Sequence, residues 1–355
     1  MILSQPSQLS QHRLRRSWSQ AHLAQESGVS RAEISAIETG RLVPSVAVAL
    51  RLAAAMGESV EAIFGGTPAS APLPWAWPPD TRDDHRVWRA TVGGKLLAFP
   101  VEPTAAGMIP HDGTIAGHRF EIVAPQARPE RTLVIAGCDP LVGLLVQELS
   151  EHHGVRVLPL QRSSSEALDL LRRGLVQVAG VHWTDDRGHA ANDEVVRAHL
   201  GTGYSLLHQL RWDAGIAVMP DRRERTASAL LKANVRWVNR EEGSAARHAF
   251  DRLLADGRRP KGYGHVVHDH RSVAATVSSG WAEAGFCVRP AAAEVRLGFI
   301  PLQREAYELC VSESMLDDPR VMALGATLRS RRYRQLVSDI PGCASNDTGE
   351  QRGIA

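Results

Sequence analysis

The sequence predicts a multi-domain protein in which an all-α N-terminal unit is followed by a small β-rich segment and a larger α/β domain. The 355 residues are enough for two or three domains. Apolar residues recur at helical spacing up to residue 64, whereas short apolar runs alternate with helical stretches after residue 131. Between these regions, seven glycines and prolines within 65–79 interrupt any regular element.

The composition excludes several classes of protein. Hydrophobic residues make up 43% and charged residues 23%, which is typical of a globular chain and not of a disordered one. The net charge of +2, from 41 basic and 39 acidic residues, is too small for binding nucleic acid by charge alone. Met1–Arg16 lacks the apolar stretch of a secretory signal, and no uncharged apolar run is long enough to span a membrane, so we expect a cytoplasmic protein with no membrane partner.

The predicted boundaries follow from these shifts in composition. They are a helical unit at 1–64, a Pro- and Trp-rich linker at 65–86, a β-rich segment at 87–130, an α/β domain at 131–344 and a flexible tail at 345–355. Because a linker in solvent would not carry two indoles, Trp75 and Trp77 predict that part of this linker packs on a neighbouring surface.

Each later element is predicted from a short apolar run or a helical period. The β-rich segment has candidate strands at 87–88, 96–101 and 119–123. The α/β domain has candidate strands at 132–136, 155–160, 176–181, 215–219, 235–238 and 286–288. Its candidate helices end near residues 152 and 173 or cover 243–255, 272–279 and much of 315–340.

The segment from Trp18 to Arg41 predicts two short helices joined by a tight turn. Ser19 and Ser30 can each cap a helix, because a serine side chain accepts a hydrogen bond from an N–H group that the first turn leaves unpaired. Gly28 lies between the helices, where a left-handed backbone conformation favours glycine. The apolar positions that would form the shared core are Leu23, Ala24, Val29, Ile34 and Ile37.

Leu9–Phe64, including this turn, resembles the Xre/Cro-type helix-turn-helix domain. The resemblance implies that Ser30–Thr39 enters the major groove of double-stranded DNA. The residues that it places at DNA are Gln20, Ser30, Arg31, Ala32, Glu33, Ser35 and Arg41, with Gln20 and Arg41 near phosphates. Independently of any family, Arg31 has the fork that binds O6 and N7 of guanine, and Glu33 can accept from N4 of cytosine.

Three glutamates make these helices less basic than phosphate binding favours: Glu26, Glu33 and Glu38. We therefore expect DNA binding to depend on a homodimer that reads two half-sites. The alternative is a helical bundle that binds another protein.

Three helices of the α/β domain begin with small or hydroxyl residues directly after a predicted strand, at Gly137–Pro140, Ser163–Ser165 and Glu242–Ser244. The positive end of a helix and its free N–H groups favour an anion there, and ligands of α/β folds bind at this edge of the sheet. The alternative is that each serine only caps its helix.

Five runs in the second half resemble the periplasmic-binding-protein-like domain related to molybdate- and tungstate-binding proteins: 133–140, 174–183, 239–247, 270–285 and 301–309. The resemblance covers about 131–349 and implies a type II fold with two lobes and a ligand between them. The candidate ligand residues are Asp139, Ser163, Ser164, His182, Asn239, Arg240, Gly243, Ser244, Arg247, His270 and Tyr307.

This chain departs from the family pattern at three places. Gly243–Arg247 lacks one glycine and one hydroxyl of the usual Gly-Ser-Gly-Thr-Arg, Ser163–Leu168 replaces a helix start that contains glycine, and Cys138 stands where serine is common. These changes leave another small anion or a small organic ligand as alternatives to molybdate.

The histidines and cysteines do not predict a metal site. The four cysteines lie far apart without a CxxC pair, which is typical of reduced thiols. On an extended strand His268 and His270 would share a face while His265 points away, too few donors for a structural zinc site. His182 could donate to a ligand or to a carbonyl, and Arg240 and Arg247 could bind an anion or pair with neighbouring glutamates.

The sequence as a whole favours a binding protein and not an enzyme, because no nucleophile elbow, phosphate loop or HExxH motif occurs. We predict a one-component transcriptional regulator, without a cofactor, that binds operator DNA as a homodimer and senses a small anion, most simply molybdate or tungstate. Whether it represses or activates is open. The alternative is a cytosolic oxyanion-buffering protein that uses its helical domain for protein contacts.

Overall fold

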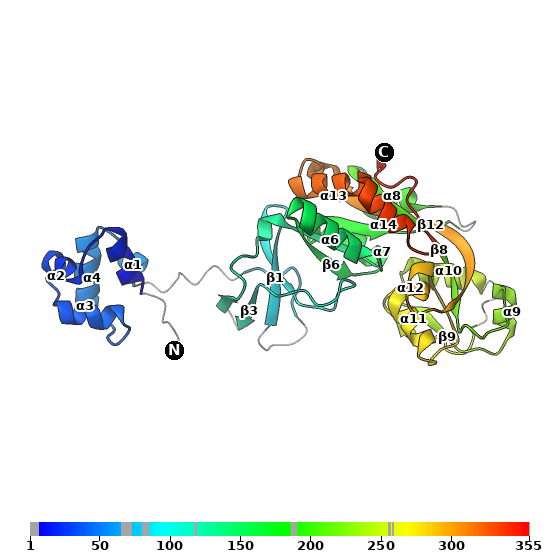
Figure 1. Ribbon diagram of the computed structural model, residues 1–355, viewed down its shortest axis with the longest axis horizontal. Helices are drawn as coiled ribbons and strands as arrows, with labels where there is room; N and C mark the ends of the chain where they lie inside the picture. The colour runs from blue at the N-terminus through cyan, green and yellow to red at the C-terminus, as the bar shows by residue number, and fades with distance from the viewer. Residues whose placement is uncertain are drawn as a thin grey trace. The chain divides into compact units, whose positions relative to one another are not determined.

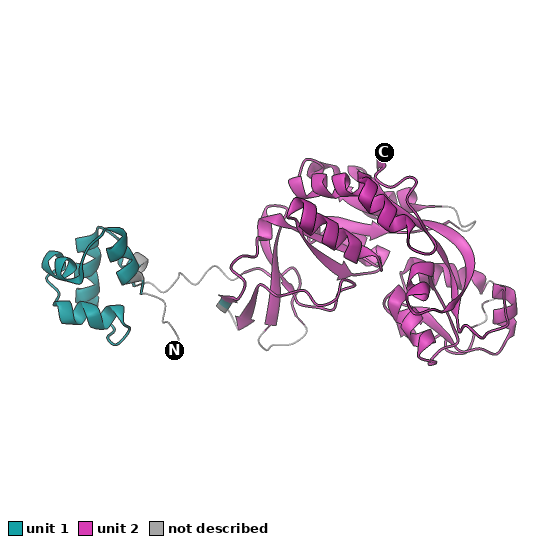
Figure 2. Ribbon diagram, in the orientation of Figure 1, with its two compact units in different colours: residues 1–72, 118–120 teal, residues 73–117, 121–355 magenta. Residues whose placement is uncertain are grey.

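The computed structural model describes residues 7–64, 73–79, 85–116, 119–185, 190–254, 257 and 259–354, which belong to two compact units. The first unit comprises 1–72 with a short segment at 118–120, and the second comprises 73–117 and 121–355 (Figure 2). In the described part of the chain, the helices are too short or too polar to cross a lipid bilayer.

The first unit is all-α, as predicted. Its helices are α1 (Gln8–Arg15), α2 (Gln20–Ser27), α3 (Arg31–Glu38), α4 (Val46–Met56) and α5 (Val60–Ile63). Ser19 caps α2 and Ser30 caps α3, each accepting from a backbone N–H three residues on. Gly28 has φ 63°, so the predicted left-handed turn is confirmed. The core contains Leu23, Val29, Ile34 and Ile37, with Leu52 and Met56 from α4.

The second unit begins with a four-stranded sheet in the order β2-β1-β3-β4. Its strands are β1 (His85–Val92), β2 (Lys95–Pro100), β3 (Gly113–Ala116) and β4 (Arg119–Ile122). The described part of the linker packs on this sheet, as its tryptophans predict. Ala76 donates its N–H to the carbonyl of Ala98 (2.8 Å), and Trp77 contacts the ring of Phe99 edge-on. Residues 65–72 and 80–84 of the predicted linker lie outside the described residues.

This small sheet is an extension of the α/β domain and shares its core. Trp88 and Phe99 are fully buried in one apolar cluster with Val134 and Leu158 of the larger sheet. Asp112, itself buried, also accepts two hydrogen bonds from Arg156 (2.5 and 2.8 Å). Apart from 118–120, the predicted 87–130 segment therefore belongs to the same compact unit as residues 131–344.

The larger sheet has the order β10-β9-β11-β8-β12-β7-β5-β6, with β13 and β14 also paired to β8. The strands are β5 (Thr132–Gly137), β6 (Arg156–Gln161), β7 (Val178–Val181), β8 (Tyr204–Val218), β9 (Trp237–Arg240), β10 (Val266–Val267), β11 (Ala284–Val288), β12 (Gly298–Ser312), β13 (Cys343–Ala344) and β14 (Gln351–Gly353).

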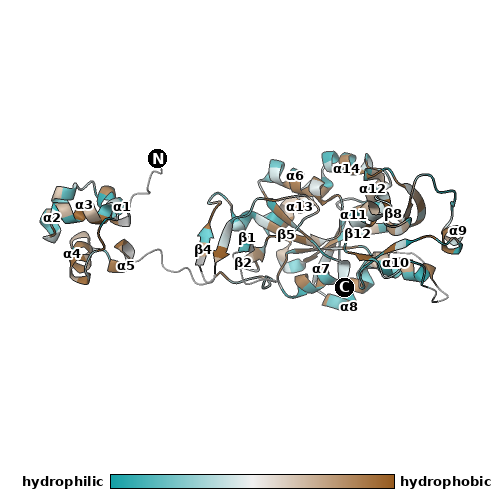
Figure 3. Ribbon diagram, turned by 90° about the horizontal axis from the view of Figure 1, so that it is seen from below, coloured by the Kyte–Doolittle hydropathy of each residue, from teal (hydrophilic) through white to brown (hydrophobic). Residues whose placement is uncertain are grey.

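Helices flank this sheet and mix hydrophilic and hydrophobic residues, as α6, α7 and α10 show in Figure 3. They are α6 (Val142–His153), α7 (Ser164–Arg172), α8 (Asn192–Leu200), α9 (Ala227–Lys232), α10 (Ala245–Leu253), α11 (His270–Ser278), α12 (Arg289–Glu294), α13 (Pro319–Arg329) and α14 (Arg331–Ser338). Short 3₁₀ helices occupy η1 (Pro129–Arg131) and η2 (Glu313–Met315).

Two long antiparallel strands divide the domain into lobes, as the type II fold requires. β8 and β12 have 15 residues each and pair along nearly their whole length. One end joins β5, β6 and β7 in a first lobe with α6, α7, α13 and α14, and the other joins β9, β10 and β11 in a second lobe with α9–α12 (Figure 1). The predicted strand at 215–219 covers only the end of β8. The rest of β8 was not predicted, because nearly all of its side chains are buried as it crosses both lobes, and buried and exposed residues therefore do not alternate along it.

The predicted flexible tail at 345–355 is wrong as far as Ile354, the last described residue. β14 pairs with β8, and the N–H of Ile354 donates to the carbonyl of Tyr204 (2.7 Å). The side chains of Thr348 and Ile354 are buried. The tail is ordered because β8 has unpaired backbone groups at this edge and Ile354 packs into an apolar cluster. The polar composition of the tail does not reveal these partners, which are distant in sequence.

Candidate functional site

The residues predicted at DNA bases lie on one side of α3. Ile34 and Ile37 face the core, whereas Arg31 and Ala32 are exposed and Glu33 and Ser35 are half-exposed. Ser30 is occupied as the cap, since its hydroxyl accepts from the N–H of Glu33 (3.2 Å). Arg31 therefore stands on the first turn of an exposed helix, as a residue that reads a base in the major groove must.

The residues predicted near phosphates are partly engaged within the domain. Gln20 donates to Glu38 (2.8 Å), which also accepts two hydrogen bonds from Arg13 (2.7 and 3.0 Å). Burial opposes the charge of Glu38, but hydrogen bonds from Arg13 and Gln20 outweigh it and hold the pKa of its carboxyl below the usual value. Arg41 donates to the hydroxyl of Thr39 (2.9 Å). One of the three glutamates expected to weaken phosphate attraction is therefore neutralised by an arginine.

A cavity of about 950 Å³ lies in the second unit, where the two lobes and the small sheet meet. The walls come from residues 102–107 after β2, from the ends of β5 and β6 with the start of α7, and from β10 with the start of α11. Its charged residues include four carboxylates and two guanidinium groups: Glu102, Glu166, Glu241, Asp269, Arg162 and Arg271. Acidic groups thus outnumber the arginines in the lining.

Carboxylates already occupy the helix starts that border this cavity. Asp139 accepts from the N–H of Leu141 (2.7 Å) before α6, and Asp269 accepts from Ser272 (2.6 Å) at the start of α11. Ser163 and Glu166 form a capping box on α7, in which each side chain accepts from the other residue's N–H. A helix end that holds a carboxylate repels a second anion, so these starts are weaker oxyanion cradles than their sequence suggests.

Several predicted ligand residues serve the structure of the second lobe. Asn239 accepts from the N–H of Arg240 (2.9 Å), and Ser244 caps α10. Arg247 donates to the carbonyl of Arg240 (3.1 Å), to Asp251 and to Tyr263. Gly243 has φ 81° in the turn before α10. In the described structure these residues lie outside the cavity lining, as do Ser164 and Tyr307, while Ser163 and His270 belong to it.

The lobes touch beside the cavity. The hydroxyl of Ser165, on α7 of the first lobe, donates to the carbonyl of Gly243 in the second lobe (3.0 Å). Arg240, only 1% exposed, uses Nε and Nη2 to bind Glu241, whereas its Nη1 is buried without a hydrogen-bond partner among the described residues.

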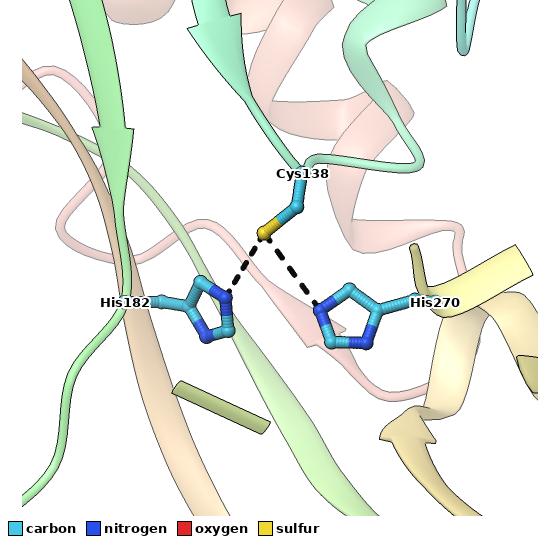
Figure 4. Close-up of side chains that lie close together, drawn as sticks. All are labelled: Cys138, His182 and His270. Carbon is cyan, nitrogen blue, oxygen red and sulfur yellow. Dashed lines mark hydrogen bonds between the residues drawn. The ribbon is translucent and has the colours of Figure 1, made fainter. Parts of the chain in front are cut away.

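Three buried side chains that are distant in sequence meet at this cavity: Cys138, His182 and His270 (Figure 4). The Sγ of Cys138 lies 3.0 Å from Nε2 of His182 and 3.9 Å from Nε2 of His270. Cys138 follows β5 and His182 follows β7 in the first lobe, whereas His270 begins α11 in the second lobe. Sequence reasoning missed this cluster, although Cys138 occupies the end of a parallel strand, where ligands of α/β folds bind.

The extended conformation considered for His268 and His270 does not occur. β10 ends at Val267, Asp269 caps α11, and His270 is the first residue of that helix. His270 is therefore buried, at 1% exposure, while the side chain of His268 is 82% exposed. The helix cap turns His270 toward the lobe interface, which an extended strand would not do.

A second layer of hydrogen bonds orients His182. Its Nδ1 lies 2.8 Å from Glu305, which also accepts from Trp212 (2.9 Å) and Gln303 (2.6 Å). The carboxylate accepts a hydrogen bond from Nδ1–H, and Nε2 is the nitrogen that faces Cys138. This carboxylate contact replaces the alternative in which His182 donates to a carbonyl.

The two histidines have opposite electrostatic surroundings. Burial alone would lower the pKa of His182, but Cys138 and Glu305 outweigh it and raise the value to about 10. Burial, followed by the charges of Arg240 and His182, holds the pKa of His270 well below its usual value. His270 is thus a neutral imidazole at neutral pH. A thiol and two imidazoles that converge can hold a soft metal cation, and a thiol beside an imidazole can also be an activated nucleophile.

Comparison with known proteins agrees with both parts of this architecture. The model of the PBP superfamily domain matches residues 146–329, and the model of a helix-turn-helix domain matches residues 9–63. The chain is similar to the uncharacterized protein YvgK of Bacillus subtilis (strain 168), with 29% identity over 235 residues, 64% of this chain and 74% of that protein. It is also similar to a protein in the 5′ region of the ferredoxin 2Fe-2S gene of Clostridium pasteurianum, with 28% identity over 90 residues, 25% of this chain and 80% of that one.

Among solved structures, the chain is similar to an ABC-type phosphate transport receptor from Vibrio cholerae, with 13% identity and a TM-score of 0.42, over 58% of this chain and 97% of that one. It is likewise similar to a reduced form of OxyR from N. meningitidis, with 13% identity and a TM-score of 0.42, over 60% and 98%. The PBP superfamily model covers more than half of the chain, and the fold has the two lobes joined by long strands that this superfamily implies. The chain belongs to the PBP superfamily, here combined with an Xre-type helix-turn-helix domain.

Proposed function

We propose that this protein is a one-component transcriptional regulator that binds operator DNA through α3 and senses a small ligand in the cavity between the lobes. One observation carries the proposal: a helix-turn-helix with an exposed recognition helix and a two-lobed domain with a cavity of about 950 Å³ occur in one chain. The two domain types are binding modules, so the proposed activity is regulation and not catalysis.

The proposed coupling is a shift between open and closed lobes. A ligand that contacts both lobes stabilises the closed form, and only such a difference in affinity can change the state of the regulator. We further propose a homodimer, because one α3 of eight residues reads a single half-site and a second copy doubles the contacts.

An oxyanion such as molybdate or tungstate is one ligand class for this cavity. The buried Nη1 of Arg240, which has no hydrogen-bond partner among the described residues, supports it from just behind Glu241 of the lining. The carboxylates at the starts of α6, α7 and α11 count against it, because they would repel an anion at the same positions.

Selection of DNA sites from a random duplex library tests the regulatory function. We expect the full chain to enrich one two-fold symmetric site and to bind it at least 10³-fold more tightly than unrelated DNA, a ratio typical of specific regulators. Fluorescence anisotropy on that site, with molybdate, tungstate, phosphate and divalent metal salts added singly, should show one compound that changes operator affinity. Failure to enrich any site, together with binding of an oxyanion, would favour the buffering protein instead.

A further inference from the structure

We propose that Cys138, His182 and His270 form a binding site for a late first-row divalent metal cation of the Zn²⁺ type, and that this cation is what the cavity senses. The inference deepens the proposed function and rests on it, since it names the chemical class of the ligand. The cluster combines one sulfur and two nitrogen donors, the donor types that such cations prefer over the hard oxygen ligands of Mg²⁺ and Ca²⁺.

The donor atoms are close to the spacing that a tetrahedral cation needs. Metal–sulfur and metal–nitrogen bonds of the usual lengths place sulfur and nitrogen about 3.5 Å apart. The two observed separations from Sγ of Cys138, 3.0 and 3.9 Å, lie on either side of this value. All three donor atoms lie within 4.8 Å of one another. Each separation between sulfur and nitrogen would have to change by about 0.5 Å to reach the value expected with a bound cation.

The surroundings of His182 are those of a metal ligand. A ligating imidazole usually donates its other N–H to a carboxylate, which fixes the tautomer and strengthens the ligand. Glu305 provides this contact at Nδ1 of His182, and Trp212 and Gln303 hold Glu305 in turn. The other ring nitrogen, Nε2, lies 3.0 Å from Sγ of Cys138, so this imidazole joins the carboxylate to the thiol.

The local charges balance for a divalent cation. In the metal-free chain the carboxylate of Glu305 is paired with His182, and Arg240 is paired with Glu241. A bound cation would displace the protons of the Cys138 thiol and of Nε2 of His182, so the resulting thiolate and Glu305 would supply two negative charges. A divalent cation therefore makes the buried group neutral, which matters because an uncompensated buried charge is costly. The cavity lining also favours a cation over an anion, since its four carboxylates outnumber its two guanidinium groups.

The same cysteine and histidine could also form an activated thiol, with Glu305 orienting the base. A nucleophile of that kind needs a single imidazole. Here His270 brings a second ring nitrogen to the sulfur from the opposite lobe, which favours a metal site over a catalytic thiol.

The position of the cluster connects metal binding to the state of the lobes. Cys138 and His182 belong to the first lobe and His270 to the second, so one cation would bind both lobes at once (Figure 4). The cation would therefore bind the closed form more tightly than the open form, in which His270 is separated from the other two donors. A sensor requires such a difference in affinity.

Titration of the reduced, full-length protein with Co²⁺ tests the site. We expect one Co²⁺ per chain with a thiolate-to-cobalt charge-transfer band in the near ultraviolet, and displacement by Zn²⁺. Cys138→Ser should abolish the band. Glu305→Gln removes the group that orients His182 and should weaken Co²⁺ affinity by ~10- to 100-fold. His270→Gln removes a ligand and should weaken Co²⁺ affinity by at least as much. The matched control is His152→Gln, an exposed residue of a second cluster that holds Glu148, Glu151 and His152. That cluster has no cysteine, so the substitution should leave the band unchanged.

Alkylation by iodoacetamide tests the site in the wild-type chain, without any variant that could fail to fold. Bound Zn²⁺ should protect Cys138 from modification, as measured by peptide mass. Absence of the charge-transfer band, or rapid modification of Cys138 that Zn²⁺ does not slow, would overturn the metal site.

Operator binding separates this inference from the proposed function. A chain that binds its selected DNA site and responds to another compound, but shows no cobalt band, is a regulator without this metal site. A chain that shows the band and the Zn²⁺ protection but enriches no DNA site has the metal site and is not the proposed regulator.

Discussion

At the residue scale, close packing around Tyr307 requires glycine at two neighbouring positions, Gly137 and Gly180. The hydroxyl of Tyr307 lies against two glycines, where an added Cβ would come within 2.3 Å at Gly137 and 1.8 Å at Gly180. Tyr307 is fully buried and contacts the ring of Trp212, 4.8 Å away between centroids. The ring therefore has little room to move aside.

We expect Gly180→Ala to destabilise the protein by about 1–3 kcal/mol or more, because the new methyl group would overlap Tyr307. Gly143→Ala is the matched control. A Cβ at Gly143 in α6 meets no atom of the described residues within 4 Å, so alanine should be neutral or stabilising by up to ~1 kcal/mol. Urea unfolding followed by circular dichroism measures both, and equal stabilities of the two variants would contradict this account.

Arg31 is the residue on which sequence-specific DNA binding is expected to depend. If its guanidinium reads a guanine, Arg31→Ala should weaken binding to the selected operator by about 1–3 kcal/mol and relax the preference at one base pair. Arg223→Ala, an exposed arginine of the second unit, is the control for loss of one positive charge. An unchanged footprint for Arg31→Ala would reject this role.

At the element scale, the C-terminal strand is part of the first lobe. Arg352 on β14 donates to both oxygens of the buried carboxylate of Glu308 (2.5 and 2.6 Å). Burial opposes the charge of Glu308, but His208, Arg352 and Asn192 outweigh it and lower its pKa to about 2. β14 thus closes a polar network that would otherwise leave a buried charge.

Ile354→Ala should cost about 2–5 kcal/mol of unfolding free energy, the range for removing a buried isoleucine side chain, since Ile354 is only 3% exposed. Gln351→Ala, on β14 just before Ile354 but exposed, should change stability by no more than ~0.5 kcal/mol. Chemical denaturation measures the free energy of unfolding of both variants. If the tail were disordered, neither substitution would change that free energy.

At the scale of the whole second unit, contacts between the lobes set how readily the cavity opens. The hydrogen bond from Ser165 to the carbonyl of Gly243 joins α7 to the second lobe. It is exposed, so its contribution is modest.

Ser165→Ala should shift the ligand-free chain toward the open form by about 2- to 10-fold, the equivalent of ~0.5–1.4 kcal/mol for one hydrogen bond. Hydrogen exchange of residues 266–272, which line the cavity, should become faster by a similar factor. Ser278→Ala, whose hydroxyl bonds only within α11, is the control. Unchanged exchange in Ser165→Ala would mean that this contact does not hold the lobes together.

The helix caps and the turn at Gly28 could be predicted from the sequence because they depend on neighbouring residues. The alternation of strands and helices after residue 131 could be predicted for the same reason. The long strand β8 was predicted only at its end, and β12 was not predicted as a strand, since both exchange packing partners as they pass from one lobe to the other. The predicted helix at 272–279 begins two residues earlier, at His270, because Asp269 caps it, and the extended arrangement considered for His268 and His270 therefore does not form.

The sequence by itself determined the helical unit, the α/β class and the family to which the chain belongs, because local periodicity and short motifs carry that information. Only the tertiary structure decided the composition of the cavity. Cys138 lies 44 residues from His182 and 132 from His270, and the order of strands in the sheet brings them together. The ordered tail has the same origin. Contacts of this kind depend on topology, and the spacing of residues along the chain does not encode which strand ends will meet.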